Sequence, residues 1–232
     1  MNIDYLKSLG FTQPNIVEYK DENFQVFCKE NLHTLYINNA RSMFWNSLDN
    51  KAVFEFYSHY DLAKGHCICT GMGFLLREKW LLNKKEVTKL TVIENNTDVI
   101  EYHRKFNKDV FDQIEVINMD VYDYRGKCDT LLMDNFECNG GWEFTYFEPR
   151  FLSSLSHITN NIKSEVSWAW PIEEVLMNHY RNYIGLSLLE LYENIKTYFN
   201  LQTFPNLTES QLAHYCYHFS LGNFSLCHSS KL

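Results

Sequence analysis

The chain has 232 residues, of which 45% are hydrophobic and 22% are charged, and its formal net charge is −8 at pH 7. This composition excludes a disordered chain, because disorder needs low hydrophobicity together with high net charge. An acidic chain is a poor general binder of nucleic acid, since phosphate contacts depend on Lys and Arg. No apolar run approaches the roughly 18 residues of a membrane span, and the N-terminal residues lack the apolar core of a secretory signal. We therefore expect a cytoplasmic protein that binds neither nucleic acid nor membranes.

The seven cysteines are odd in number and irregularly spaced, and none forms a Cys-x-x-Cys motif. This pattern favours free, mostly buried thiols in a reducing compartment over disulfides. His214 and His218 are four residues apart and could share one face of a helix, but no third ligand stands near them in the sequence. We therefore predict no metal site.

A small β-region is predicted over residues 1–48, where short runs of β-branched and aromatic residues alternate with polar turns. Its strands are predicted at residues 16–20, 24–28 and 32–37. Asp49 can then cap a helix that runs to about residue 63. Residues 49–232 would form a second, larger region that carries the chemistry.

From residue 65 onward, predicted strands and helices alternate. The strands are predicted at residues 66–70, 90–93, 114–117, 130–133 and 162–168, and the helices between them at residues 74–82, 97–106 and 145–157. Thr97 is the expected cap of its helix. This alternation predicts right-handed βαβ units and an α/β architecture with a mainly parallel sheet.

The pattern weakens after residue 171. Residues 184–199 predict a helix, and Thr208 with Gln211 resembles a capping box that opens a further helix. The last residues, around 222–227, predict an edge strand.

Two glycines and three acids follow the ends of successive predicted strands. Gly71 and Gly73 follow the first strand, and Glu94 ends the second, 21 residues after Gly73. A carboxylate at that place can accept hydrogen bonds from ribose hydroxyls. Asp120 follows the third strand, within reach of an adenine amino group, and Asp134 ends the fourth, where the reacting group would lie. Each residue alone is often a turn or a helix cap, but together they predict a nucleoside-binding site.

The identity of the nucleoside depends on a missing glycine. A dinucleotide site needs a third glycine where this chain has Leu76, so a nicotinamide-dependent oxidoreductase is disfavoured. S-adenosylmethionine, or its decarboxylated form, has no pyrophosphate and makes no such demand. Its sulfonium cation would suit aromatic faces, for which the candidates, with core packing as the alternative role, are Trp142, Trp168 and Trp170.

At this point the sequence resembles the spermidine synthases, the aminopropyltransferase branch of the S-adenosylmethionine-dependent methyltransferase superfamily. The resemblance covers about residues 24–160 and is carried by the segments GHCICTGMGFLLREKW, LTVIENN, NMDVYDY and LLMDNFE. It implies a Rossmann-like methyltransferase fold with a small N-terminal β-region, and commonly a homodimer. It also assigns the cofactor to a set of residues that comprises Gly71, Met72, Gly73, Glu94, Asp120 and His59.

The resemblance implies roles for the acceptor side as well. Asp134 matches the family's general base, and Glu137 matches an acid that helps hold the amine acceptor. Glu55 and His59 match a Glu-x-x-x-His motif on the helix before the glycine-rich loop. We place Glu55 and Trp168 with Glu137 on the substrate side.

Several positions depart from the family's pattern. Met72 replaces an aspartate that meets the free amino end of decarboxylated S-adenosylmethionine, and its loss removes a charge that would repel the carboxylate of S-adenosylmethionine itself. Cys138 replaces a proline after the catalytic acids. Near the N-terminus, Asn38–Asn39 replaces an Asp-Gly turn, and Ser42 stands in place of a glutamine. The cofactor pocket is therefore retained better than the polyamine pocket.

Taken together, these features predict a transferase that moves a methyl group from S-adenosylmethionine to a small, amine-bearing acceptor by in-line displacement, with Asp134 as the base. Glu137, Glu143 and Glu148 could form an acidic mouth or a solvated surface. Two alternatives stay open: an aminopropyltransferase that uses decarboxylated S-adenosylmethionine and a polyamine, and a non-catalytic member of the fold that binds a nucleoside or a partner protein.

Overall fold

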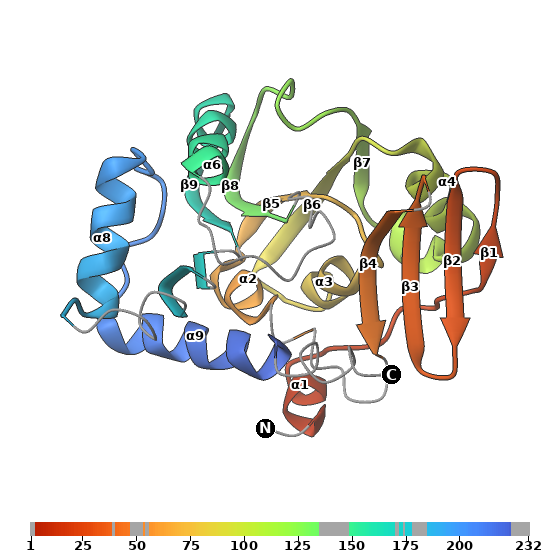
Figure 1. Cartoon of the computed structure of the whole chain (residues 1–232). Helices are drawn as coiled ribbons and strands as arrows, with labels where there is room; N and C mark the ends of the chain where they lie inside the picture. Colours follow the sequence, from red (N-terminus) through yellow and green to blue (C-terminus); the bar gives the residue numbers. More distant parts are fainter. Residues whose placement is uncertain are drawn as a thin grey trace.

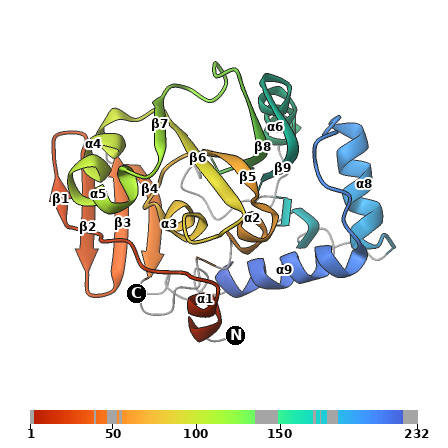
Figure 2. The ribbon, with the colours of Figure 1, turned by 180° about the vertical axis from the view of Figure 1, so that it is seen from behind.

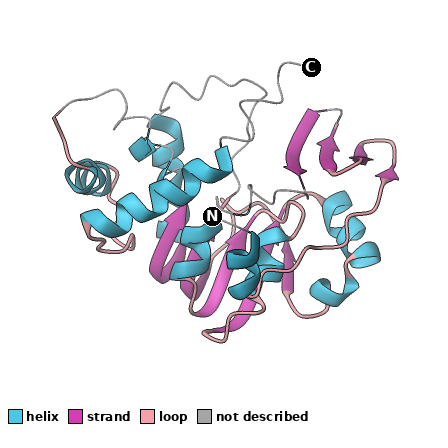
Figure 3. Ribbon diagram, turned by 90° about the horizontal axis from the view of Figure 1, so that it is seen from below, coloured by secondary structure: helices cyan, strands magenta, loops and turns pink. Residues whose placement is uncertain are grey.

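The computed structural model describes residues 3–38, 40–46, 56–134, 149–169 and 185–223, together with residues 53, 172, 173 and 175–177. Its strands fall into two separate sheets, with helices around them (Figures 1 and 3). One sheet is small and antiparallel and comes from the N-terminal part of the chain, and the other is parallel.

The small sheet has four strands in chain order. They are β1 (Tyr19–Lys20), β2 (Phe24–Lys29), β3 (Leu32–Ile37) and β4 (Ala40–Asn46). The first three correspond to predicted strands, whereas β4 was not predicted. One face of the sheet is apolar, since Phe24, Val26 and Leu35 are almost fully buried. Phe24 packs on Tyr102 of α4 (Thr97–Phe106) with ring centroids 5.6 Å apart, so this helix lies against the sheet (Figure 2).

The parallel sheet has the order β7-β6-β5-β8-β9. Its strands are β5 (Gly65–Thr70), β6 (Val87–Glu94), β7 (Glu115–Asn118), β8 (Gly126–Met133) and β9 (Ile162–Ala169). The central three contain continuous buried runs, as expected for strands covered on both faces. The chain moves outward from β5 to β7 and then returns to the other side of β5 with β8. The order therefore reverses beside β5, and the predicted Rossmann-like α/β fold is confirmed.

The helices of the parallel region lie between these strands along the chain. They are α3 (Leu76–Leu81), α4, the short α5 (Lys108–Phe111) and α6 (Pro149–Asn161). The predicted cap of α4 is wrong by one residue, because Asn96 caps it: its side chain accepts hydrogen bonds from the N–H groups of Asp98 and Val99. The predicted helix from Asp49 is observed as α2 (Tyr57–Leu62), and residues 49–52 lie outside the described residues.

The C-terminal part is helical where it is described. It contains α8 (Leu188–Tyr198) and α9 (Glu209–Asn223), which runs along the bottom of the molecule in Figure 1. The predicted capping box of α9 is confirmed, since Gln211 N–H donates to Thr208 Oγ1 and Thr208 N–H donates to Gln211 Oε1. The predicted edge strand is wrong for residues 222 and 223, which belong to α9, and the rest of it lies outside the described residues.

The N-terminal segment, from α1 (Ile3–Ser8) to Val17, packs on the parallel region before the chain enters the small sheet. The indole N–H of Trp80 donates to the carbonyl of Leu9 at 2.9 Å, and Asn83 Nδ2 donates to the carbonyl of Gly10 at 2.8 Å. The Tyr102 hydroxyl donates to the Val17 carbonyl at 2.8 Å. These contacts tie residues 9–17 to α3 and α4.

Two general features of the described residues complete the fold. None of the helices described is long and apolar enough to cross a membrane. The cysteines that the structure describes are free thiols, namely Cys28, Cys67, Cys69, Cys128 and Cys216.

A buried polar cluster joins α2 to the segment that follows β9. The indole N–H of Trp168 donates to Ser58 Oγ at 2.9 Å and to Glu173 Oε1 at 3.0 Å. Glu173 is 1% exposed, and its Oε2 has no hydrogen-bond partner. Burial raises the pKa of Glu173 to about 8, so this carboxyl group is largely protonated in the folded protein at neutral pH.

Glu173 makes stability depend on pH. In the unfolded chain its pKa returns to about 4.3, so between this value and about 8 the folded state holds the extra proton. Stability from this group is present at low pH and is lost as pH rises, with a slope of up to about 1.4 kcal/mol per pH unit. We expect Glu173→Gln to remove this slope, measured by urea unfolding from about pH 5 to about pH 8, because the amide does not titrate.

The matched control is Glu193→Gln, on the exposed side of α8 beside Lys196. It should keep the pH dependence of the wild-type protein, because it leaves the buried Glu173 carboxyl group and its surroundings unchanged. Equal pH profiles for the wild type and Glu173→Gln would contradict the assignment.

Candidate functional site

The turn that follows β5 is at the centre of the candidate site. Gly71 and Gly73 have φ angles of 73° and 49°, in the left-handed region that favours glycine. The Gly71 N–H donates to the carbonyl of Ile93 on β6 at 2.9 Å. The turn closes with the Leu75 N–H donating to the Met72 carbonyl at 2.9 Å. The two glycines thus allow the backbone to turn sharply at the carboxyl edge of the sheet.

Glu94 fixes this turn from the neighbouring strand. Its Oε2 accepts the Met72 N–H at 2.9 Å, and its Oε1 accepts the Asn96 N–H at 2.8 Å. Burial raises the pKa of Glu94, while the hydrogen bonds from the backbone of Asn96, Met72 and Asn95 oppose that shift. A carboxylate has about four acceptor sites, so each oxygen can accept a further hydrogen bond from a ligand.

His103 holds the same turn from α4, and sequence reasoning missed it. Its Nε2 lies 2.7 Å from the Gly73 carbonyl, and its Nδ1 lies 3.1 Å from Asn107 Nδ2. Because a carbonyl only accepts, Nε2 carries the proton and Nδ1 accepts from the Asn107 amide. Burial lowers the pKa of His103 to about 4, so the ring is neutral at pH 7. The signal in the sequence was a His-x-x-x-Asn spacing on one helix, which is too common to single out.

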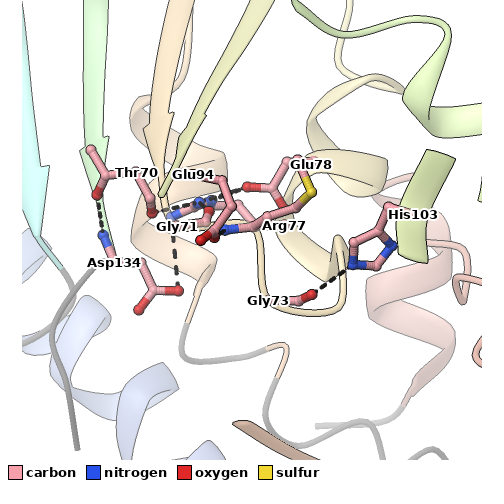
Figure 4. A network of polar contacts seen from close by, with 9 residues as sticks. Thr70, Gly71, Gly73, Arg77, Glu78, Glu94, His103 and Asp134 are labelled. Atoms are coloured by element: carbon pink, nitrogen blue, oxygen red, sulfur yellow. Dashed lines mark hydrogen bonds and ion pairs between the residues drawn. The ribbon is translucent and has the colours of Figure 1, made fainter. Parts of the chain in front are cut away.

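Arg77 lies beneath the turn with a side chain that is 3% exposed. Its Nη2 donates to the carbonyl of Gly71 at 2.9 Å and to that of Thr70 at 3.2 Å. Its Nε and Nη2 also donate to Glu78 Oε1 at 2.8 and 2.6 Å. A buried ion pair within α3 therefore anchors the end of β5 (Figure 4).

Asp134 stands on the other side of β5. Its N–H donates to Thr70 Oγ1 at 2.9 Å, and its Oδ2 lies 3.9 Å from Arg77 Nη1. The Asp134 side chain is 28% exposed. Glu94 and Asp134, which end the strands on either side of β5, therefore lie in one polar network with the turn (Figure 4).

Asp120 follows β7 at the same edge of the sheet and is exposed. Its Oδ1 accepts the Tyr122 N–H at 2.9 Å, which is the geometry of a turn cap. Asn118, at the end of β7, donates from Nδ2 to the Glu94 carbonyl at 3.0 Å and so links this segment to β6. An adenine contact for Asp120 stays a prediction.

Met72 and His59 are buried. Met72 is 2% exposed, and His59 is fully buried, with no hydrogen-bond partner at either ring nitrogen. Burial, and secondarily the charge of Arg77, lower the pKa of His59 well below its ordinary value. The ring is therefore neutral, and contact of either residue with a cofactor stays a prediction.

Trp168 packs in the core, and the contact with substrate expected for it stays a prediction. It is fully buried, its N–H is used by Ser58 and Glu173, and its ring packs against Tyr192, Phe204 and Tyr215. The other acceptor-side residues singled out from the sequence lie outside the described residues: Glu55, Glu137, Cys138, Trp142, Glu143, Glu148 and Trp170.

The buried ion pair makes Arg77 essential for stability. Arg77→Met would leave the Glu78 carboxylate buried without its cation, at an expected cost of about 3–5 kcal/mol in the free energy of unfolding. Lys79→Met, on the same helix, removes only a pair with the exposed Asp109 and should cost less than about 1 kcal/mol. Urea unfolding of both variants measures the difference, and equal losses would contradict the role given to Arg77.

Comparison with solved structures gives low-identity matches. The chain is similar to a spermidine synthase from Thermotoga maritima, with 17% identity over 72% of this chain and 62% of that one and a TM-score of 0.44. It is also similar to a spermidine synthase in complex with the transition-state analogue AdoDATO, with 18% identity over 72% and 64% of the two chains and a TM-score of 0.45. A proposed RNA methyltransferase from Pyrococcus horikoshii is 15% identical over 77% and 80%, with a TM-score of 0.42.

This chain therefore spans less than two thirds of either spermidine synthase chain. No protein-family model and no curated protein matches this chain. The fold assignment rests on the strand order given above.

Proposed function

We propose that the chain is an S-adenosylmethionine-dependent transferase that methylates a small, amine-bearing acceptor. One observation carries the proposal: the carboxylates of Glu94 and Asp134 lie on either side of the glycine turn after β5, in one polar network. This is where the strand order of the sheet reverses, and ligands of open α/β sheets bind at that point.

The residues at this edge fit a nucleoside. The positive φ angles at Gly71 and Gly73 allow a tight turn, and because glycine has no Cβ the backbone there can approach a ligand closely. Glu94 retains acceptor capacity for two ribose hydroxyls, and its carboxylate is already oriented by the Met72 and Asn96 N–H groups. When bound, S-adenosylmethionine would supply a carbon attached to a sulfonium, which is a good leaving group.

Asp134 would act on the acceptor. The Asp134 carboxylate, whose Oδ2 lies 3.9 Å from Arg77 Nη1, would attract an ammonium group and then accept its proton. The amine must be neutral to attack, so the ammonium proton would pass to Asp134 before the new carbon–nitrogen bond forms. As that bond forms, the carbon–sulfur bond of the sulfonium would break, with its electron pair going to sulfur. The rest of the chain's contribution is positioning, because His103, Glu94 and Arg77 hold the turn in one conformation.

Met72 favours methyl transfer over aminopropyl transfer. An aspartate in its place would meet the amino end of decarboxylated S-adenosylmethionine and repel the carboxylate of S-adenosylmethionine. The chain has neither the attraction nor the repulsion. Assays that supply each cofactor together with a panel of amines would distinguish the two reactions. A labelled aminopropyl product from the decarboxylated form alone would show that the chain transfers an aminopropyl group and not a methyl group.

Binding is testable before the acceptor is known. We expect S-adenosylmethionine to bind the wild-type protein in calorimetry, with methylthioadenosine as a second probe. Glu94→Gln should weaken binding at least about 10-fold, since the amide places a donor against a backbone N–H. Glu101→Gln makes the same change on the exposed face of α4 and should leave the affinity unchanged. If none of the nucleosides binds the wild-type protein, the proposal is wrong.

Catalysis depends on Asp134. Asp134→Asn removes the proton acceptor without changing the size of the side chain, so kcat should fall by about 10²–10⁴-fold while the affinity for S-adenosylmethionine stays the same. Asp112→Asn, which removes half of an exposed ion pair with Lys108, serves as the control and should keep full activity. An unchanged kcat in Asp134→Asn would exclude it as the base.

A further inference from the structure

Asn118, at the end of β7, is bonded to the segment that follows β6 by its whole side-chain amide. Its Cα pairs with that of Glu94, and both strands end at these two residues. Beyond this pair, the carbonyls of Glu94 and Asn95 accept hydrogen bonds from Asn118 Nδ2 at 3.0 and 3.2 Å. The amide oxygen accepts the Thr97 hydroxyl at 3.3 Å. Both donors and the acceptor of this side chain therefore hold the segment between β6 and α4.

The bond to Asn95 acts on Glu94 through one peptide group. The Asn95 carbonyl and the Asn96 N–H belong to the same planar unit and point to opposite sides of it. Asn118 binds the carbonyl end, and Glu94 Oε1 accepts the N–H end at 2.8 Å. A carbonyl that accepts a hydrogen bond polarises its own peptide group and makes the N–H a better donor. Asn118 therefore stabilises a group that orients the Glu94 carboxylate.

The two oxygens of Glu94 are oriented by different segments. The Met72 N–H of the glycine turn holds Oε2 at 2.9 Å, and the Asn95–Asn96 peptide group holds Oε1. Each oxygen keeps acceptor capacity, so the carboxylate presents two acceptors side by side in a fixed direction. A cis-diol offers two hydroxyl donors on adjacent carbons and matches this arrangement. Loss of one support would let the carboxylate turn, and hydrogen bonds to the diol depend on its direction.

We propose that Asn118 is a positioning residue that makes the cofactor site selective for an intact ribose diol over a deoxyribose. The inference rests on the function proposed above, in which Glu94 binds the ribose. Asn118 acts without touching the ligand, because both of its donors are used by the backbone. Its effect reaches the ribose through the Asn95–Asn96 peptide group and the Glu94 carboxylate. The cofactor class that follows is a ribonucleoside with both hydroxyls unmodified.

Calorimetry with methylthioadenosine and its 2′-deoxy counterpart tests this role. We expect the wild-type protein to bind the ribonucleoside at least about 10-fold more tightly, because the deoxy form lacks a donor to a charged acceptor. In Asn118→Ala this preference should shrink to about 3-fold or less, chiefly through weaker binding of the ribonucleoside. A merely structural role would weaken the binding of both ligands equally. An unchanged preference in Asn118→Ala would therefore overturn the proposal.

Asn83→Ala is the matched control, because the Asn83 amide also donates to two backbone carbonyls, those of Gly10 and Lys79, but beyond the C-terminal end of α3. It should keep the wild-type preference, and an equal loss there would contradict a specific role for Asn118. Thr97→Val removes the bond to the Asn118 oxygen and leaves both amide donors in place, so most of the preference should remain. Each preference is a ratio measured on one protein, so a change in stability cancels.

The outcomes separate this proposal from the transferase function. If the wild-type protein binds neither nucleoside, the proposed function is wrong, and this inference is wrong with it. If the wild-type protein binds both nucleosides equally, the cofactor site stands and the selectivity for the diol is wrong. If the wild-type preference persists in Asn118→Ala, both the site and the selectivity stand, and only the role of Asn118 is wrong.

Discussion

The candidate site depends on a guanidinium group that is buried beneath the turn after β5. The carbonyls of Thr70 and Gly71 lie at the end of the central strand β5, where the hydrogen bonds between strands no longer satisfy every backbone group. Arg77 donates a hydrogen bond to both carbonyls. A buried cation is unfavourable alone, and Glu78 compensates it from the next position on the same helix. The pair therefore stabilises one conformation of the backbone at the point where the strand order reverses.

Three other elements act on the same few residues. His103 on α4 holds the Gly73 carbonyl, Glu94 at the end of β6 holds the Met72 N–H, and Asp134 at the end of β8 is hydrogen-bonded to Thr70. A turn that is held from several directions needs little ordering when a ligand binds, so more of the interaction energy contributes to affinity. The same arrangement leaves the Glu94 and Asp134 carboxylates on opposite sides of it.

The sequence predicts those elements that are set by patterns of neighbouring residues in the chain. The three central parallel strands contain continuous buried runs, and the places of the acids after the strands follow from the order of the strands. Contacts between distant segments were not predictable. The strand β4 was missed because its pairing with β3 defines it. The hydrogen bonds of Trp168 could not be foreseen, because its partners Ser58 and Glu173 come from other elements. His103 was missed for the same reason, since its role depends on a carbonyl 30 residues earlier.

The N-terminal segment has a consequence for synthesis. The carbonyl of Leu9 is bound by Trp80, which is 71 residues later in the chain, and that of Val17 by Tyr102, 85 residues later. At a translation rate of about 5–20 residues per second, this segment waits several seconds after its own synthesis for the surfaces that cover it. Its apolar side chains, with Leu6 and Phe11 almost fully buried in the finished protein, are accessible to chaperones during that interval.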